Sequence, residues 1–509
     1  MFSLRQLFLS VLVSLLADLS IGKCPSADLS LCKCAEEAAR PNQLIVTCDG
    51  MATVPDLKYQ LDAFDWKEIS ELAVLRQKSF AGLRPDFFNQ MPNLVRLSLA
   101  ANPNSNFKPP VGLFDKLGPK LSVLDMSTSN LTEKELSPEL FAPLVNLKEL
   151  DLSYNQITQL RPTVFQSLAK LRVLDLGDNK LTVLPPFMLA KNKRLKMLDL
   201  NDNLLTELPM DLFDDEQKEM KILDIGGNRI TKLTADHLVL MPNLTVLDAR
   251  RNMINPLPSN LFSKSPQLQR ISLDGVTAPV VPASLFNGLP LESLDLSDAV
   301  NVRSLPEDLL APVGKTLKEL HLDDNQKLFS LPPNFFRGLD ALEMLDLSNT
   351  GLDLLPTSFF SDLKSLRRLK ISDNQYLISL PPPKDYSPNL KSIDAKNCPK
   401  LPPVVTKWIN TNFDTKPQMM DFPINIYRSA NKDMMLRMAA ATSTGPAATT
   451  SRPTQPSNQY NGNGRGNGNN GWNNKDNEGW AADGDNGNSN NNNNYNNNYN
   501  SGGWGGWRR

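Results

Sequence analysis

The 509-residue chain has little of the chemistry that catalysis commonly uses. It contains 2 histidines, and the GxSxG, HExxH and GxxxxGK[ST] motifs are absent from its sequence. Its formal net charge of −1 provides none of the excess positive charge with which nucleic-acid binders contact phosphates. We therefore expect no catalytic site, no metal site, no cofactor and no nucleic-acid partner.

Long apolar runs are missing too. No stretch after the N-terminus approaches the roughly 20 apolar residues that a membrane span requires. Met1–Gly22 combines a short basic region with the apolar core Leu7–Leu16, which is too short to cross a bilayer, and ends in small residues. The C-terminal SGGWGGWRR lacks the apolar tail of a lipid-anchor signal. We predict that residues 1–22 are a signal peptide cleaved before Lys23, and that the protein is secreted to the extracellular space or matrix without a membrane span.

The chain has 5 cysteines, four of which lie close together after this cleavage site: Cys24, Cys32, Cys34 and Cys48. A cluster of four cysteines in an exported chain predicts two disulfide bonds. A zinc site is disfavoured, because the cluster contains neither a CxxC pair nor a nearby histidine.

From Ile69 onward the chain repeats the pattern LxxLxLxxN, as in LKELDLSYN (Leu147–Asn155) and LRVLDLGDN (Leu171–Asn179). The spacing averages (390 − 69)/13, or about 24.7 residues. The fourteen copies begin at residues 69, 94, 121, 147, 171, 195, 220, 244, 268, 291, 317, 342, 366 and 390.

This pattern resembles the extracellular leucine-rich-repeat proteins of animals, and the resemblance covers about Cys24 to Pro403. It implies an α/β fold: a curved solenoid with a parallel sheet on the concave face and turns and short helices on the convex face. Residues 23–68, with CPSADLSLCKC and VTCDG, resemble the cysteine-rich N-terminal cap of that family. The cap implies the disulfide pairs Cys24–Cys34 and Cys32–Cys48, although the gap between the first two cysteines is longer than in many members.

The repeat pattern also has a physical interpretation. Each copy supplies a short strand whose fourth and sixth residues point inward, and stacked copies bury what one strand cannot. The ninth residue should hydrogen-bond to backbone groups of adjacent turns. Cys398 occupies the ninth position of the last copy, which favours a buried thiol over a free reactive one. The ninth-position asparagines are Asn102, Asn155, Asn179, Asn203, Asn228, Asn252, Asn325 and Asn374. A phenylalanine column should fill the convex side, comprising Phe88, Phe114, Phe141, Phe165, Phe213, Phe262, Phe286, Phe336 and Phe360.

The repeats, residues 69–403, are followed by three further segments. In residues 404–440, which lack a four-cysteine cap, Trp408, Phe413 and Phe422 should cover the last repeat. Residues 441–457 form a Thr/Pro/Ala/Ser linker. Residues 458–509 contain 20 Asn and 12 Gly and should be disordered. Because this tail holds four of the 6 tryptophans, it could drive self-association, with an inert tail as the alternative.

The concave face should carry the binding surface. The fifth residue of nine copies is aspartate: Asp125, Asp151, Asp175, Asp199, Asp224, Asp248, Asp295, Asp346 and Asp394. The third residue is apolar in the middle copies, and an apolar strip beside carboxylates favours a partner site. The predicted docking surface comprises Val173, Asp175, Met197, Asp199, Ile222, Asp224, Val246 and Asp248, with Arg250 and Arg251 at its edge. The alternative is that LDLS and β-favouring valines are ordinary repeat features.

Two histidines and two sequons complete the candidate positions. His237 lies on the outer part of its copy and should be structural, whereas His321 lies on the strand face, where it could tune binding with pH or be a plain surface residue. Asn130 and Asn243 begin Asn-x-Thr sequons and are predicted glycosylation sites.

The sequence therefore predicts a secreted, non-enzymatic scaffold that binds an extracellular protein or glycan. We expect an extracellular-matrix or adhesion component. Two other classes remain open: a soluble innate-immune recognition protein, and a non-catalytic subunit of a secreted enzyme or a biomineral matrix protein. The fold alone does not choose among them, because one scaffold serves many functions.

Overall fold

The computed structural model describes residues 24, 31–36, 43–105, 107–381 and 388–414. The chain divides into the units Met1–Pro446 and Ala447–Arg509, and every described residue belongs to the first unit. The predicted signal peptide, the 441–457 linker, the 458–509 tail and Phe422 of the predicted C-terminal cap therefore lie outside the described residues.

The described residues form one 16-stranded sheet whose strands follow each other in chain order. β1 (Cys32–Glu36) pairs antiparallel with β2 (Leu44–Asp49), and every later pairing is parallel. Each of the fourteen predicted copies supplies one strand, from β3 to β16. They are β3 (Ile69–Leu75), β4 (Arg96–Ser98), β5 (Val123–Asp125), β6 (Glu149–Asp151), β7 (Val173–Asp175), β8 (Met197–Asp199), β9 (Ile222–Asp224), β10 (Val246–Asp248), β11 (Arg270–Ser272), β12 (Ser293–Asp295), β13 (Glu319–His321), β14 (Met344–Asp346), β15 (Arg368–Lys370) and β16 (Ser392–Asp394).

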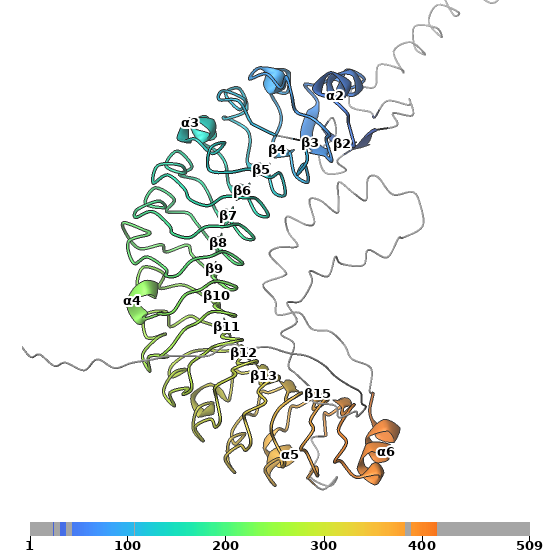
Figure 1. Ribbon diagram of the computed structural model, residues 1–509, viewed down its shortest axis with the longest axis vertical. Helices are drawn as coiled ribbons and strands as arrows, with labels where there is room; N and C mark the ends of the chain where they lie inside the picture. The colour runs from blue at the N-terminus through green and yellow to red at the C-terminus, as the bar shows by residue number, and fades with distance from the viewer. Residues whose placement is uncertain (1–23, 25–30, 37–42, 106, 382–387, 415–509) are drawn as a thin grey trace, which may run out of the picture. The chain divides into compact units, whose positions relative to one another are not determined.

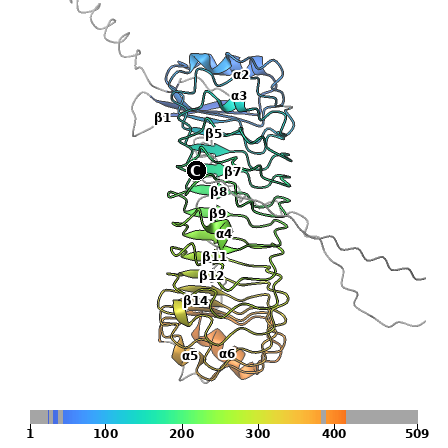
Figure 2. The same cartoon turned by 90° about the vertical axis from the view of Figure 1, so that its left-hand side faces the viewer.

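The strands line the inner side of the curved repeat stack, and the outer segments form its convex side (Figure 1). Turned by 90°, the same stack shows the strands one above another in chain order (Figure 2). The predicted solenoid, with its sheet on the concave face and turns and short helices on the convex face, is confirmed.

The core lies between these two sides. The fourth and sixth residues of the copies point inward as predicted; Leu174 and Leu176, for example, are fully buried. Beyond each three-residue strand, backbone bonds continue from copy to copy, as from Leu176 N to Asp199 O at 2.9 Å. The stack therefore satisfies backbone groups that a single copy would leave unpaired.

The ninth-position asparagines form the predicted ladder. Asn203 Nδ2 donates to Leu176 O of the preceding copy and to Leu200 O of its own copy, both at 3.0 Å. It also donates to the backbone of Asn201, while its Oδ1 accepts from Leu181 N at 2.9 Å. Cys398 takes the same place in the last copy, with Sγ 3.0 Å from Ile371 O, but it is half-buried rather than fully buried as predicted, because no later copy covers it.

The convex side is filled by the predicted phenylalanine column, whose nine members are all buried. The rings of Phe141 and Phe165 lie 6.1 Å apart, as do those of Phe262 and Phe286. Prolines in the outer segments disfavour long helices there. The helical pieces are η1 (Phe87–Gln90), α3 (Pro138–Phe141), α4 (Ala235–Leu238), η2 (Ala311–Val313) and α5 (Phe359–Asp362).

The eighth residue of every copy adopts the left-handed conformation, with φ between 48° and 72°. This residue lies where the chain leaves the strand, so the ninth residue can turn its side chain inward. Glycine occupies the position at Gly227 and Gly275, and aspartate or asparagine occupies it in seven other copies. These are the residue types that tolerate positive φ best.

Separate segments cover the two ends of the stack. At the N-terminal end, two disulfide bonds join Cys24 to Cys34 and Cys32 to Cys48, which confirms both predicted pairs. The helix α2 (Val54–Leu61) follows, and Thr53 caps it by accepting from Asp56 N.

At the C-terminal end, α6 (Pro403–Asn412) packs Trp408 against Phe413, with ring centroids 5.3 Å apart, and both side chains contact the core. These are two of the three aromatic residues that we expected there. The chain then returns to the sheet: Asp414 forms a parallel bridge with Ser392 of β16, in which Asp414 N donates to Lys391 O at 3.2 Å.

Candidate functional site: the concave face

The register of the sheet places the fifth-position aspartates in one row. Cα pairing runs unbroken through six consecutive strands, β5 to β10, and so through Asp125, Asp151, Asp175, Asp199, Asp224 and Asp248. Since neighbouring strands lie about 4.8 Å apart, the row spans on the order of 24 Å. The predicted alignment of these carboxylates is confirmed.

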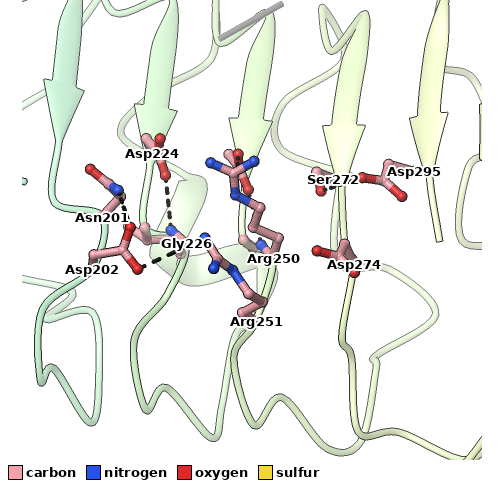
Figure 3. Close-up of polar contacts among 12 residues, drawn as sticks. Asn201, Asp202, Asp224, Gly226, Arg250, Arg251, Ser272, Asp274 and Asp295 are labelled. Carbon is pink, nitrogen blue, oxygen red and sulfur yellow. Dashed lines mark hydrogen bonds and ion pairs between the residues drawn. The ribbon is translucent and has the colours of Figure 1, made fainter. Parts of the chain in front are cut away.

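Each aspartate of the row has a structural role that was not predicted from the sequence. Its Oδ1 accepts a hydrogen bond from the backbone N–H two residues further on, as Asp175 does from Gly177 at 2.9 Å. Figure 3 shows the same bond between Asp224 and Gly226, also at 2.9 Å. This Asx-type bond closes the end of the strand. One carboxylate oxygen per aspartate is therefore committed to the backbone.

The row is also more buried than a solvent-facing sheet suggests. Burial raises the pKa of Asp151 to about 7, with the charge of Asp125 adding to the shift. Burial also raises the pKa of Asp248 to about 6, although Arg250 opposes it, and raises that of Asp224 well above its ordinary value. The row is therefore not a set of solvent-screened charges, because in-register neighbours desolvate one another.

The predicted apolar strip is only partly accessible. Val173 and Val246 are half-buried, but Met197 and Ile222 are 4% and 3% exposed. Our expectation of an open apolar patch is wrong for these two residues. Side chains on adjacent strands of a concave sheet lie close enough to cover one another, and the long Met and Ile side chains pack into that space.

The two arginines at the edge of the strip contact carboxylates of this face. Arg250 Nε lies 3.3 Å from Asp248 Oδ2, and Arg251 Nη2 lies 3.8 Å from Asp202 Oδ1 of a copy two strands away (Figure 3). As donors for a partner they would first have to leave these ion pairs.

A second set of carboxylates lies at the turn that follows each strand, at the eighth position of the copies. The eighth position carries aspartate in five copies, and the side chains are half-buried or exposed, which makes them more accessible than the buried row. Asn349 Nδ2 donates to Asp324 Oδ1 at 2.7 Å. These five aspartates, which we call the rim, were not among the predicted site residues, although they share one position in the repeat alignment: Asp178, Asp202, Asp298, Asp324 and Asp373.

The two histidines differ in role. His237 is buried, and its Nδ1 lies 3.0 Å from Thr234 N at the start of α4, in agreement with the structural role that we expected. Burial lowers the pKa of His237. His321 is half-buried on the concave face, and its Nδ1 lies 3.8 Å from Asp323 Oδ1.

The sequons lie in different surroundings. Asn130 is exposed, whereas Asn243 is half-buried and donates from Nδ2 to Lys218 O at 3.0 Å. Glycosylation of both residues stays a prediction. Within the part of the chain that the structure describes, no helix has the length and apolar character to cross a membrane.

Comparison with known proteins agrees with this geometry. A family model described as leucine rich repeat matches residues 119–181, 169–218, 218–277 and 315–375. The repeats of this chain fold as a leucine-rich-repeat solenoid. A search of curated protein sequences finds no match to it.

Solved structures share the fold of this leucine-rich-repeat solenoid. Toll, in the Toll–Spatzle complex of Drosophila, is 20% identical with a TM-score of 0.56, over 73% of this chain and 55% of that one. TLR13, in a complex with ssRNA13, is 20% identical with a TM-score of 0.51, over 69% and 57%. An internalin, InlF of Listeria monocytogenes, is 18% identical with a TM-score of 0.50, over 65% and 89%. The solenoid thus matches little more than half the length of the Toll and TLR13 chains, and these identities establish the fold alone.

Proposed function

We propose that this protein is a secreted, non-enzymatic scaffold that binds a protein partner through its concave face. The observation that carries the proposal is the unbroken register of fourteen parallel strands, which places equivalent side chains in rows along one face. A leucine-rich-repeat fold is suited to binding proteins over a large area. Affinity would then come from contacts spread over several copies rather than from one deep pocket.

The charge of this face favours a partner with basic side chains. The buried row and the rim both consist of aspartates, at the fifth and eighth positions of the copies. Rim carboxylates such as Asp298 and Asp324 are exposed and can meet lysine or arginine side chains without prior rearrangement. Complementary charge of this kind accelerates encounter and selects partners. The half-buried Val173 and Val246 would add apolar contact near the buried row.

Replacing three rim carboxylates tests the proposal. The full-length triple variant Asp298→Asn, Asp324→Asn and Asp373→Asn should lose at least about tenfold in partner affinity, because each change removes a charge pair worth about 0.5–1 kcal/mol. Asparagine tolerates the positive φ of these positions, so the fold should be unchanged. Partners captured from native fluid by the tagged wild-type protein would be identified by mass spectrometry and titrated against both proteins.

The matched control neutralises three exposed carboxylates on the convex segments, Asp115→Asn, Asp211→Asn and Asp340→Asn. It changes the net charge by the same amount and should leave binding unaltered. Unchanged binding by the rim variant, or an equal loss in the control, would reject the concave face as the docking surface.

Secretion is tested separately. We expect the full-length chain, expressed in a secretory host, to appear in the medium with Lys23 as its first residue and with Asn130 glycosylated. N-terminal sequencing and glycosidase treatment would check both points. Retention in the cytosol with Met1–Gly22 attached would contradict the proposal.

Within this function we favour an extracellular-matrix or adhesion role. The support is compositional: four tryptophans lie in an Asn/Gly-rich tail, and spaced aromatic residues can provide weak multivalent contacts. A chain truncated after Ala441 should remain in the salt-soluble fraction, whereas the full-length chain should resist salt extraction. Equal solubility of the two chains would favour a soluble recognition protein or an enzyme partner instead.

A further inference from the structure

Two copies depart from the aspartate pattern of the concave face in the same way. The copy beginning at 268 has Ser272 at the fifth position and Asp274 at the seventh, and the copy beginning at 317 has His321 and Asp323. In both copies the aspartate stands at the seventh position instead of the fifth. It therefore no longer accepts the Asx-type bond that closes the nine strands with a fifth-position aspartate, and its oxygens are released from that structural task.

In the second of these copies, three potential ligands converge. His321 of β13 and Asp346 of β14 are direct register partners, and Asp323 follows His321 by two residues. One ligand atom from each of the three side chains lies within 4.8 Å of the others. Asp295 of β12 is the register partner of His321 on the other side, so a carboxylate flanks the imidazole on both neighbouring strands.

The hydrogen bonds of this cluster leave one oxygen unused. Asp323 Oδ1 is inaccessible to solvent, although the side chain as a whole is 27% exposed, and it accepts no hydrogen bond among the residues that the structure describes. Its charged neighbour is His321 Nδ1, 3.8 Å away. The oxygens of Asp346, in contrast, accept from Ser348 N and from Lys370 Nζ, both at 3.0 Å. A buried carboxylate oxygen without a donor costs free energy, which a coordinated cation would offset.

We propose that His321, Asp323 and Asp346 bind a divalent transition-series cation, with Zn²⁺ as the probe. This goes beyond the proposed function and does not depend on it, and it revises the expectation from sequence that the chain has no metal site. One imidazole nitrogen and two carboxylates suit Zn²⁺, with ligand distances of about 2.0–2.2 Å. Ca²⁺, which takes 6–8 oxygen ligands, fits this set less well.

The chain offers an internal control for a direct test, because it contains only 2 histidines. Full-length protein, stripped with a chelator and labelled with ¹⁵N, would be titrated with Zn²⁺ while the imidazole nitrogens are observed by NMR. We expect the His321 signals to shift and to saturate at one equivalent. The signals of His237, which lies on the outer part of its copy, should stay in place. No shift at His321, or equal shifts at both histidines, would overturn the proposal.

Three variants sharpen the test. Asp323→Asn should weaken Zn²⁺ binding at least about tenfold. Lys370→Met should strengthen it, since it removes the ammonium that competes for Asp346. Asp353→Asn, on an exposed outer segment, should have no effect. Wild-type Zn²⁺ affinity in a folded Asp323→Asn protein would overturn the proposal, as would Ca²⁺ binding that is equally tight and leaves the His321 signals unmoved.

Discussion

Replacing Asn203 with alanine is expected to destabilise the solenoid by about 3 kcal/mol, a large effect for one residue. The change removes the four hydrogen bonds that this side chain makes to the backbone of its own copy and of the preceding one. Leu176 O and Leu200 O each keep a second donor from a neighbouring ladder asparagine, at 3.1 and 2.9 Å. The main cost is therefore the buried Leu181 N–H, which loses its acceptor.

Chemical denaturation would measure the loss in stability, and hydrogen exchange should locate it in peptides that contain Leu181. Asn203→Asp tests the ladder more specifically. It keeps the shape of the side chain but places a carboxylate oxygen, in place of Nδ2, against three backbone carbonyl oxygens. It should therefore lower the free energy of unfolding at least as much as alanine does. Asn260→Ala, in an exposed outer turn, should change stability by less than about 0.5 kcal/mol. A stable Asn203→Asp protein would contradict the ladder interpretation.

Stability should fall as the pH rises from about 4 to about 7. The pKa of Asp151 is about 7 in the folded protein, against about 3.9 for an unfolded aspartate. The folded state thus binds a proton more tightly than the unfolded state. The stability that this proton provides is complete below pH 4 and lost as the pH passes 7. With three pKa units at 1.36 kcal/mol each, this one site accounts for at most about 4 kcal/mol.

Asp151→Asn should abolish this part of the pH dependence. Asparagine keeps the oxygen that accepts from Ser153 N at 2.9 Å, but carries no charge for Asp125 to repel. The variant should unfold at a higher temperature than the wild type at pH 8, with the difference shrinking at pH 4. Asp353→Asn, on the exposed outer side, should parallel the wild type at both pH values. If wild type and Asp151→Asn respond identically to pH, the buried-row interpretation is wrong.

Much of the fold could be read from the sequence because the repeat itself encodes it. Leucines at the fourth and sixth positions dictate which strand face is buried, and one asparagine per copy dictates how the turn is bonded. Once one copy is placed, its neighbours follow by translation, so the register of β3 to β16 needed no information beyond the period. The disulfide pairs came from the resemblance of the cap.

The site was less predictable, because it depends on what surrounds each side chain. An aspartate such as Asp224 has the same sequence context whether it faces a ligand or closes its own strand. Only the spatial structure shows that one oxygen bonds Gly226 N while burial raises the pKa. The same holds for Met197 and Ile222, whose burial is set by adjacent strands. The His321 cluster did leave a trace in the sequence, namely the shift of aspartate from the fifth to the seventh position.

The return of the chain to β16 has a consequence for solubility. The last strand of an open sheet is a template on which a strand from another molecule can add, and this is a common route to aggregation. The bridge between Ser392 and Asp414 occupies part of that edge with the protein's own backbone. A chain that stopped at the last repeat would leave these groups uncovered, so the residues from Pro403 to Asp414 help to keep neighbouring molecules apart.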